Sequence, residues 1–296
     1  MTADEVLEYN AALAKMKKQS CEYAYANLFA WQDAYDTQIC FSDNIFYVKF
    51  CVDGSHSFLP PVGMICDYEK YIKDIIEYER KVGNKSVCFC GFDCSQTQLA
   101  ERYIGKSVFY PERGNFDYLY EVLPLETFSG KKLHSKKNHL NKFLSLYGDR
   151  YVLEELNNRN AVQCIEFTRM WGDLNRSFDT GELSKEEHSA IVMLENLERL
   201  KLFGAVLKVD GKVCGYTIGE SAYPDSDTVV IHIEKGVYDI DGVYQMLFSG
   251  FLKSLGGKYK YVNREDDVDD EGLRKSKLSY RPCGFVEKYS AEIEIN

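Results

Sequence analysis

The sequence has 296 residues, 45% of them hydrophobic and 14% aromatic, which suffices for one large or two ordinary globular domains and argues against disorder. A formal net charge of −10 disfavours non-specific nucleic-acid binding as the main activity, and we expect no stable DNA binding. The ten cysteines, the acidic start without a secretory signal, and the lack of an apolar run of roughly 18 residues favour a cytoplasmic protein with reduced thiols and no transmembrane segment.

The first half alternates strand and helix patterns. Apolar periodicity predicts helices over 5–18, 68–81, 96–104 and 136–147. Strands are predicted over 37–41, 45–50, 57–60, 87–92 and 116–122. The last helix ends at Gly148-Asp149, and we place a domain boundary there.

The second half has clearer signals for where helices and strands begin and end. It predicts a strand over 151–156, helices over 161–176 and 184–200, and strands over 203–209, 212–220 and 228–234. Asp210-Gly211 is a hairpin signal, and Ser184 followed by Glu187 predicts a capping box. A helix over 241–255, a strand over 259–263, a short helix and a strand over 286–295 complete the order.

This order of elements is that of the GNAT acyltransferase fold, and the first half gives a shorter version of it. We therefore expect an α/β (α+β) protein with mixed sheets, made of two tandem GNAT-like domains. The predicted domains are residues 1–148 and residues 149–296.

Three segments carry a family resemblance: residues 125–143, 230–245 and 261–282. They resemble a bacterial family of unknown function that is related to the C-terminal domain of phosphatidylglycerol lysyltransferase, and the likeness extends over nearly the whole chain. The resemblance implies a tandem GNAT fold, like that of the Fem peptidoglycan aminoacyltransferases. It also implies transfer of an aminoacyl group from aminoacyl-tRNA to a lipid or a peptidoglycan precursor.

The turn before the predicted helix 241–255 bears on the acyl donor. GNAT enzymes that use acetyl-CoA have a glycine-rich turn at this place, whereas residues 238–243 contain one glycine, Gly242, and two acids, Asp239 and Asp241. The acids would repel a pyrophosphate that approached the helix N-terminus. Acetyl-CoA is therefore disfavoured as the donor, and the resemblance implies aminoacyl-tRNA instead.

Three residues are candidate catalytic groups. Side chains alternate along a strand, so His232 and Glu234 should share one face of the strand 228–234, where either is placed to deprotonate an acceptor. Tyr280 is a candidate proton donor to the leaving group, as in many GNAT enzymes. The alternative for the strand is a solvated end, with Glu234 paired to a nearby lysine.

Basic residues form a block over 131–142 with no acid inside it. In an acidic protein this favours a site for anions: the acceptor end of a tRNA, a nucleotide, or a lipid head group at a membrane surface. The alternative is a solvated helix face. The candidate anion-binding residues here are Lys131, Lys132, His134, Lys136, Lys137, Asn138 and Asn141.

Further substrate-binding candidates come from the other two resembling segments. They are Tyr244, Gln245, Asn263, Arg264, Arg274, Lys275 and Lys277. The alternative for residues 265–271 is an acidic surface loop, to which Asp267, Asp269 and Asp270 are assigned.

No metal site is predicted, because the spacing of Cys88, Cys90 and Cys94 is not a usual zinc pattern. The leading function is a GNAT-type acyltransferase. The alternatives are a non-catalytic binding module on the same fold, for a nucleotide, lipid head group or peptide, and a purely structural partner protein.

Overall fold

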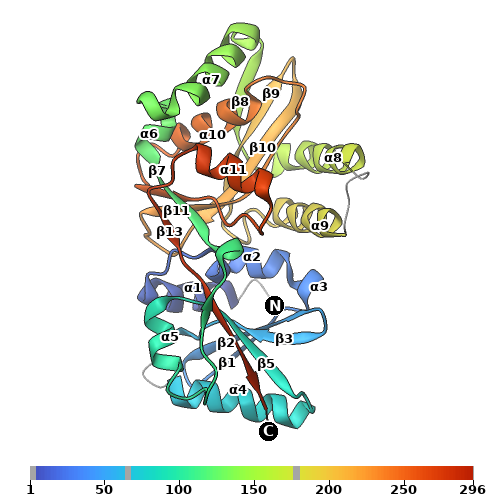
Figure 1. Ribbon diagram of the computed structural model, residues 1–296. Helices are drawn as coiled ribbons and strands as arrows, with labels where there is room; N and C mark the ends of the chain where they lie inside the picture. The colour runs from blue at the N-terminus through green and yellow to red at the C-terminus, as the bar shows by residue number, and fades with distance from the viewer. Residues whose placement is uncertain (1–4, 64–67, 176–180, 296) are drawn as a thin grey trace.

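A computed structural model describes residues 5–63, 68–175 and 181–295. These residues form two lobes, each built on a mixed β-sheet with helices against it (Figure 1). The architecture is the mixed α/β one that the order of elements predicts.

The first lobe contains a sheet in the order β1-β2-β3-β5-β14-β6, with β4 paired to β2. The amphipathic helix α4 packs Tyr71, Ile72 and Ile75 onto this sheet, against Phe89 and Ile293. The elements of this lobe are α1 (Glu5–Met16), η1 (Cys21–Tyr23), α2 (Tyr25–Ala30), α3 (Gln32–Tyr35), β1 (Gln38–Ser42), β2 (Ile45–Val52), β3 (Ser55–Phe58), β4 (Val62–Gly63), α4 (Tyr68–Val82), β5 (Ser86–Phe92), α5 (Cys94–Ala100), β6 (Tyr110–Pro111) and β14 (Tyr289–Glu294).

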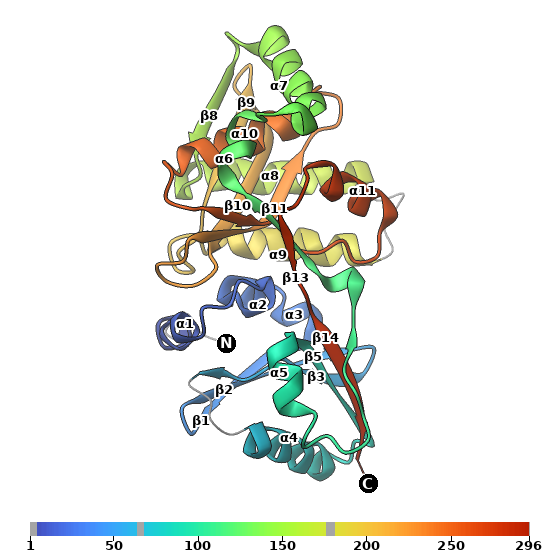
Figure 2. The same ribbon diagram turned by 60° about the vertical axis from the view of Figure 1, so that its left-hand side comes forward.

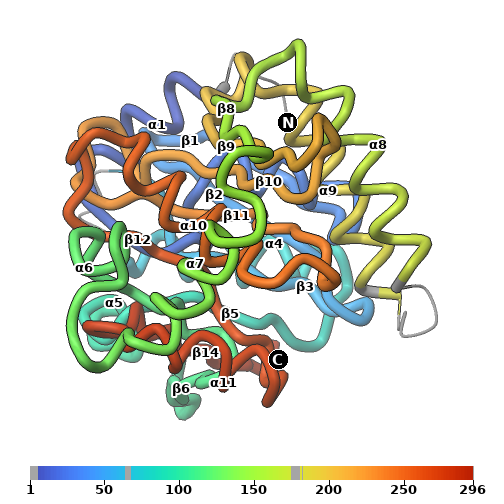
Figure 3. The backbone as a smooth tube through the Cα atoms, turned by 90° about the horizontal axis from the view of Figure 1, so that it is seen from above, coloured from blue at the N-terminus to red at the C-terminus, as the bar shows by residue number. Residues whose placement is uncertain are grey.

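The second lobe contains a sheet in the order β8-β9-β10-β11-β12-β7-β13. Helices α6, α7 and α10 pack together, whereas α8 and α9 form a separate pair on the other side of the lobe (Figure 3). The elements are η2 (Arg113–Asn115), β7 (Asp117–Glu121), α6 (Val122–Thr127), η3 (Lys131–Leu133), α7 (His134–Tyr147), β8 (Tyr151–Glu155), α8 (Asn158–Asn175), α9 (Glu182–Glu195), β9 (Phe203–Val209), β10 (Lys212–Ser221), β11 (Thr228–Gly236), α10 (Val243–Ser254), β12 (Tyr261–Asn263), α11 (Glu271–Ser279) and β13 (Gly284–Val286).

The chain passes between the lobes twice. Strand β7 follows the first-lobe elements but pairs with β12 and β13, and β14 returns to pair with β5 and β6 (Figure 2). The sheets therefore divide the chain near residues 112 and 287, which differs from the expected division at 148. The single strand predicted over 286–295 is wrong, because Glu287 and Lys288 separate two strands that belong to different sheets.

Most other predicted elements are present, with a few corrections. Helix α9 begins at Glu182 after Gly181, so Ser184 lies inside the helix and donates to the carbonyl of Gly181 instead of forming a capping box. The same helix ends at Glu195, before the predicted residue 200, because Asn196 leaves the helical conformation. Residue 176, the predicted end of the preceding helix, lies outside the described residues.

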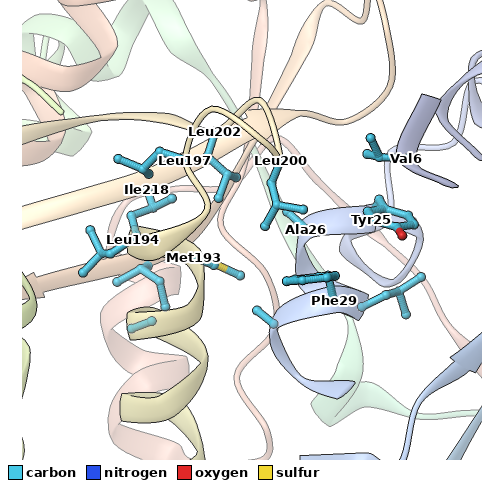
Figure 4. Packing of buried hydrophobic residues seen from close by; sticks show 14 of the residues in the cluster. Val6, Tyr25, Ala26, Phe29, Met193, Leu194, Leu197, Leu200, Leu202 and Ile218 are labelled. Carbon is cyan, nitrogen blue, oxygen red and sulfur yellow. The ribbon is translucent and has the colours of Figure 1, made fainter. Parts of the chain in front are cut away.

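The largest apolar cluster belongs to both lobes. Helices α1 and α2 contribute Val6, Tyr25 and Phe29, which face residues of α9, of the segment that follows it and of the second sheet (Figure 4). The facing side chains include Met193, Leu194, Leu197, Leu200, Leu202 and Ile218. The two sheets are therefore joined by a continuous buried core.

Candidate functional site

The candidate site lies where β11 and β12 separate. The two strands pair in parallel only between residues 228–230 and 261–263, whereas β11 continues to Gly236. Within β11, Ile231 pairs with Gly219 and Ile233 with Ile218, so His232 is an extra residue in a β-bulge. Bulges redirect side chains, often beside functional sites. The bulge thus interrupts the simple alternation expected for His232 and Glu234.

His232 lies between two carboxylates. Its side chain is 1% exposed, and its ring nitrogens lie 2.8 Å from Oε1 of Glu265 and 3.0 Å from Oε1 of Glu220. Burial lowers the pKa of His232, but the two hydrogen bonds outweigh burial and raise it to about 10. The imidazolium therefore donates through both nitrogens at neutral pH. This geometry does not favour His232 as a free base.

Glu234 and Arg264 form an ion pair across the gap between the strands. Nη2 of Arg264 donates to Oε1 of Glu234 over 2.9 Å, and both side chains are mostly buried. Oε2 of Glu234 and Nη1 of Arg264 are buried and have no hydrogen-bond partner among the described residues. Buried polar atoms are usually paired, so the unpaired acceptor and donor of this ion pair make it a candidate place for polar contacts to a ligand.

The ring of Tyr280 completes this cluster. The guanidinium of Arg264 lies 4.7 Å and Nζ of Lys136 lies 4.0 Å from the ring centroid, both within the range of cation–π attraction. Nε2 of Gln245 donates to the phenol oxygen over 2.9 Å. Burial and the nearby Arg264 lower the pKa of Lys136. Predicted residues from three separate segments therefore meet at one place.

The chain after β12 is held by α11. Nζ of Lys277 donates to the carbonyl oxygens of Arg264, over 2.6 Å, and Asp266, and burial lowers the pKa of Lys277. Lys277 therefore fixes the backbone beside the cluster, and its ammonium is already occupied. Lys275 lies exposed on the same helix.

Asp267 is wrongly assigned to a surface loop. Its side chain is 0% exposed, and the carboxylate accepts hydrogen bonds from Arg113, Tyr118 and Arg274. Burial raises its pKa, but the bonds from Arg274 and Tyr118 outweigh burial and lower it to about 2. Arg274 also pairs with the exposed Asp269, so its guanidinium holds the loop.

The basic block lies on the surface beside the cluster. Lys136 alone among its lysines reaches the ring of Tyr280 in the described structure. The other candidates of the block, on η3 and α7, are exposed: Lys131, Lys132, His134, Lys137, Asn138 and Asn141. The lysines among them give this face of η3 and α7 a positive charge beside the cluster.

The turn before α10 packs on α7. Gly242 has φ +79°, and a Cβ there would lie 2.2 Å from the carbonyl oxygen of His139. Lys142 pairs with Asp241 over 2.5 Å. The lone glycine of this turn is therefore required for packing. Tyr244, in the first turn of α10, donates to the carbonyl of Gly236 over 3.0 Å and so ties the helix to β11.

Several residues of the site were not predicted. Glu220 and Glu265 bind His232, and a buried group of Cys21, Asp117 and Lys288 lies behind Asn263. Asn263 is fully buried, and its side-chain amide is already bonded to Gln19, Asp117 and Glu265, which removes it from direct substrate contact. Isolated acids and lysines give no sequence signal of burial. Among the described residues, no group of three or more His, Cys, Asp or Glu is arranged to hold a metal ion, and no helix is long and apolar enough to cross a membrane.

The chain is similar to a known protein family and to solved structures. A family model described as "Phosphatidylglycerol lysyltransferase, C-terminal" matches residues 13–292. The crystal structure of a conserved protein of unknown function from Bacteroides thetaiotaomicron VPI-5482 superposes with a TM-score of 0.92 at 30% identity, over 99% of this chain and 98% of that one. An uncharacterized protein of Mycoplasmoides gallisepticum, MYCGA3080, is 27% identical over 179 residues, which are 60% of this chain and 56% of that relative. The match thus spans little more than half of that relative's length.

More distant structures show the fold. The C-terminal domain of a protein assigned as a lysylphosphatidylglycerol synthetase from Agrobacterium fabrum has a TM-score of 0.69 at 16% identity, over 100% of this chain and 93% of that one. A tandem GNAT protein from the clavulanic acid biosynthesis pathway has a TM-score of 0.50 at 10% identity, over 100% and 97%. These likenesses confirm the predicted fold of tandem GNAT type.

Proposed function

Because the chain belongs to the family of phosphatidylglycerol lysyltransferase C-terminal domains, we propose that it is a GNAT-type acyltransferase that moves an aminoacyl group from aminoacyl-tRNA to the amine or hydroxyl of a lipid or other small acceptor. The observation that carries this proposal is the meeting of Glu234, Arg264, Tyr280 and Lys136 where β11 and β12 separate. This cluster offers a base, a hydrogen-bond donor for the carbonyl oxygen and a proton donor for the leaving group within one site.

The unpaired atoms of the ion pair support a proposed role for each residue. Oε2 of Glu234 accepts the proton of the acceptor amine or hydroxyl, while Nη1 of Arg264 donates to the carbonyl oxygen of the aminoacyl ester. The acceptor then forms its bond to the carbonyl carbon and the ester bond to the tRNA ribose breaks. Tyr280 gives its proton to the departing ribose oxygen, and the proton taken up by Glu234 then returns to the Tyr280 phenolate, so that both groups are restored. Backbone amides of β11 beyond the paired residues add to the stabilisation of the carbonyl oxygen.

The basic block supports the choice of donor. Lys136 lies at the cluster, and the exposed lysines of η3 and α7 continue away from it along the surface. A row of cations leading to a reaction centre suits the phosphates of a tRNA acceptor end. The glycine-poor turn before α10, whose one glycine packs on α7, offers few free amides to a CoA pyrophosphate.

The test is a donor and acceptor screen with a matched pair of variants. Purified protein is incubated with labelled aminoacyl-tRNAs or acyl-CoAs, and with anionic lipids or small amines as acceptors. We expect transfer from an aminoacyl-tRNA, and we expect Glu234→Gln to lower kcat/KM by about 10²–10⁴-fold. Glu154→Gln, which removes a carboxylate paired with Lys208 elsewhere on the second sheet, should leave the rate unchanged.

Three outcomes decide between the functions. Transfer that is equal in Glu234→Gln and wild type removes Glu234 from the reaction. Transfer from acyl-CoA alone contradicts the proposed donor. A ligand that raises the melting temperature without any turnover supports the alternative of a non-catalytic binding module.

A further inference from the structure

Asn263, the last residue of β12, joins three parts of the chain. Its Nδ2 donates to the carbonyl oxygen of Gln19 over 2.7 Å and to Oδ2 of Asp117 over 2.8 Å. Its Oδ1 accepts from the backbone N–H of Glu265 over 2.7 Å. A side-chain amide has two N–H donors, and both are used here. Asn263 therefore acts on the site through its neighbours.

The bond to Glu265 supports an unusual backbone turn. Glu265 has φ +56°, a left-handed conformation that is uncommon for residues with a Cβ. An Asn side chain that bonds the backbone two residues later stabilises such turns. Strand β7 holds the same place, since Tyr118 donates to the carbonyl of Glu265 and Arg264 donates to the carbonyl of Tyr118, each over 3.0 Å. The turn directs Glu265 to His232 and leaves Arg264 beside Glu234.

Behind Asn263 lies a buried ion cluster at the junction of the lobes. Lys288 and Asp117 are 1% and 0% exposed, and Nζ of Lys288 lies 2.6 Å from Oδ1 of Asp117 and 2.9 Å from Oε1 of Glu22. The backbone N–H of Cys21 donates to Oδ2 of Asp117 over 2.8 Å. Cys21 and Glu22 lie between α1 and α2, and Lys288 lies where the chain returns to the first sheet. Asn263 thus connects the contacts between the two lobes with the reaction centre.

We propose that Asn263 is a positioning residue that couples the packing of the first lobe on the second to the geometry of the reaction centre. It does so by holding Glu265 against His232 and Arg264 against Glu234. The expected change in transfer rate rests on the proposed function. The orientation of Glu265 does not, because the titration of His232 reports it without turnover. The charged groups that face His232 are Glu220 of β10 and Glu265.

The test uses Asn263→Leu, which keeps the number and branching of the side-chain heavy atoms and removes all three hydrogen bonds. The titration of His232 is followed by NMR with labelled histidine, and its signal is assigned from His232→Gln. We expect the titration midpoint, about 10 in the wild type, to fall by about one unit or more as Glu265 turns away. Aminoacyl transfer should fall by about tenfold or more, because small misplacements of reacting groups are costly.

Asn160→Leu is the matched control. Asn160 is also buried, and it accepts from the backbone of Asn157 over 2.8 Å and donates to the carbonyl of Glu155 over 2.9 Å. Its loss should lower stability comparably, since similar buried bonds are removed, while the titration of His232 and the transfer rate remain unchanged.

Asp117→Asn is the second variant, and it removes the charge to which Asn263 and Lys288 bind. We expect the same direction of change in the titration of His232, so the inference stays testable where Asn263→Leu does not fold. A folded variant of either kind in which His232 titrates as in the wild type overturns the proposal. A wild-type protein with no transfer activity contradicts the proposed function alone.

Discussion

Asp266 lies beside the ion cluster that joins the lobes, and its surroundings change its ionisation. Its carboxylate is 3.9 Å from Nζ of Lys288 and shares the region with Asp117 and Glu22. Burial raises the pKa of Asp266 to about 7, against the opposing effect of Lys288. In an unfolded chain the pKa of the same group is about 3.9. Between these values the folded protein holds a proton that the unfolded chain has lost.

A consequence for stability follows from this difference. Stability should fall as the pH rises from about 4 through about 7, because the unfolded chain binds fewer protons in this window. Asp266→Asn removes the ionisation, so we expect it to be more stable than the wild type by about 4 kcal/mol at pH 8 and nearly equal to it at pH 4. Urea unfolding at both pH values measures this, with the exposed Asp149→Asn as a control that changes stability equally at both. An advantage of Asp266→Asn that is the same at pH 4 and pH 8 contradicts the assignment.

Sequence reasoning could identify several site residues but not their partners. The sequence indicates Glu234 and Arg264 as polar groups at the ends of predicted strands and Lys136 as part of the basic block, whereas Tyr280 is a candidate through the resemblance to GNAT enzymes. The protonation of His232 was not predictable, since Glu220 and Glu265 reach it only through a β-bulge and a left-handed turn.

Among the elements, η3 and α7 have the clearest testable role. Lys131, Lys132 and Lys137 are exposed beside the reaction centre, and phosphate contacts give a binding constant that depends on salt. We expect the triple change of these lysines to Glu to weaken aminoacyl-tRNA binding by about 10-fold or more at low salt and to reduce the slope of log Kd against log salt. Fluorescence anisotropy with a labelled tRNA measures both.

The matched control for this triple variant is the triple change of Lys106, Lys212 and Lys253 to Glu. These lysines are equally exposed but lie on other elements. Both triple variants alter the net charge equally, so any general electrostatic effect cancels. Equal losses in the two variants indicate that the charge of the whole protein, and not α7, governs binding.

At the scale of the whole molecule, the shared core predicts one unfolding unit. Leu197 of the second lobe packs in the same cluster as Tyr25 and Phe29 of the first. Leu197→Ala should lower the free energy of unfolding by about 2–5 kcal/mol, because it leaves a cavity at the centre. The two tryptophans, Trp31 in the first lobe and Trp171 in the second, pack against this shared cluster from opposite lobes, and each becomes a single probe once the other is changed to Phe. We expect both to show the same transition midpoint.

Two separate transitions in these single-tryptophan proteins contradict the idea of one unit. They would instead agree with the sequence-based division into residues 1–148 and 149–296, which stays a prediction for independently folding parts. Exposed Leu123, on α6 and away from the shared cluster, provides the control: Leu123→Ala should change stability little.

The fold type could be predicted from the order of elements, whereas the exchange of strands between the lobes could not. Periodicity predicts a strand over 116–122 but does not indicate which sheet it joins. The break at Lys288 likewise depends on Asp117 and Glu22, which are distant in sequence. The pairing of strands that are distant in sequence is determined by tertiary packing, which local sequence patterns do not predict.

The return of β14 to the first sheet also affects synthesis of the protein on the ribosome. Strand β5 is made early, but its neighbour β14 emerges only after the whole second lobe. Until then β5 presents an open edge, the kind of surface to which other chains add. All strands of the second sheet, in contrast, come from the continuous stretch from β7 to β13. The later-made lobe therefore has its full set of strands first, and the nascent first lobe is the part whose sheet stays incomplete until the end of synthesis.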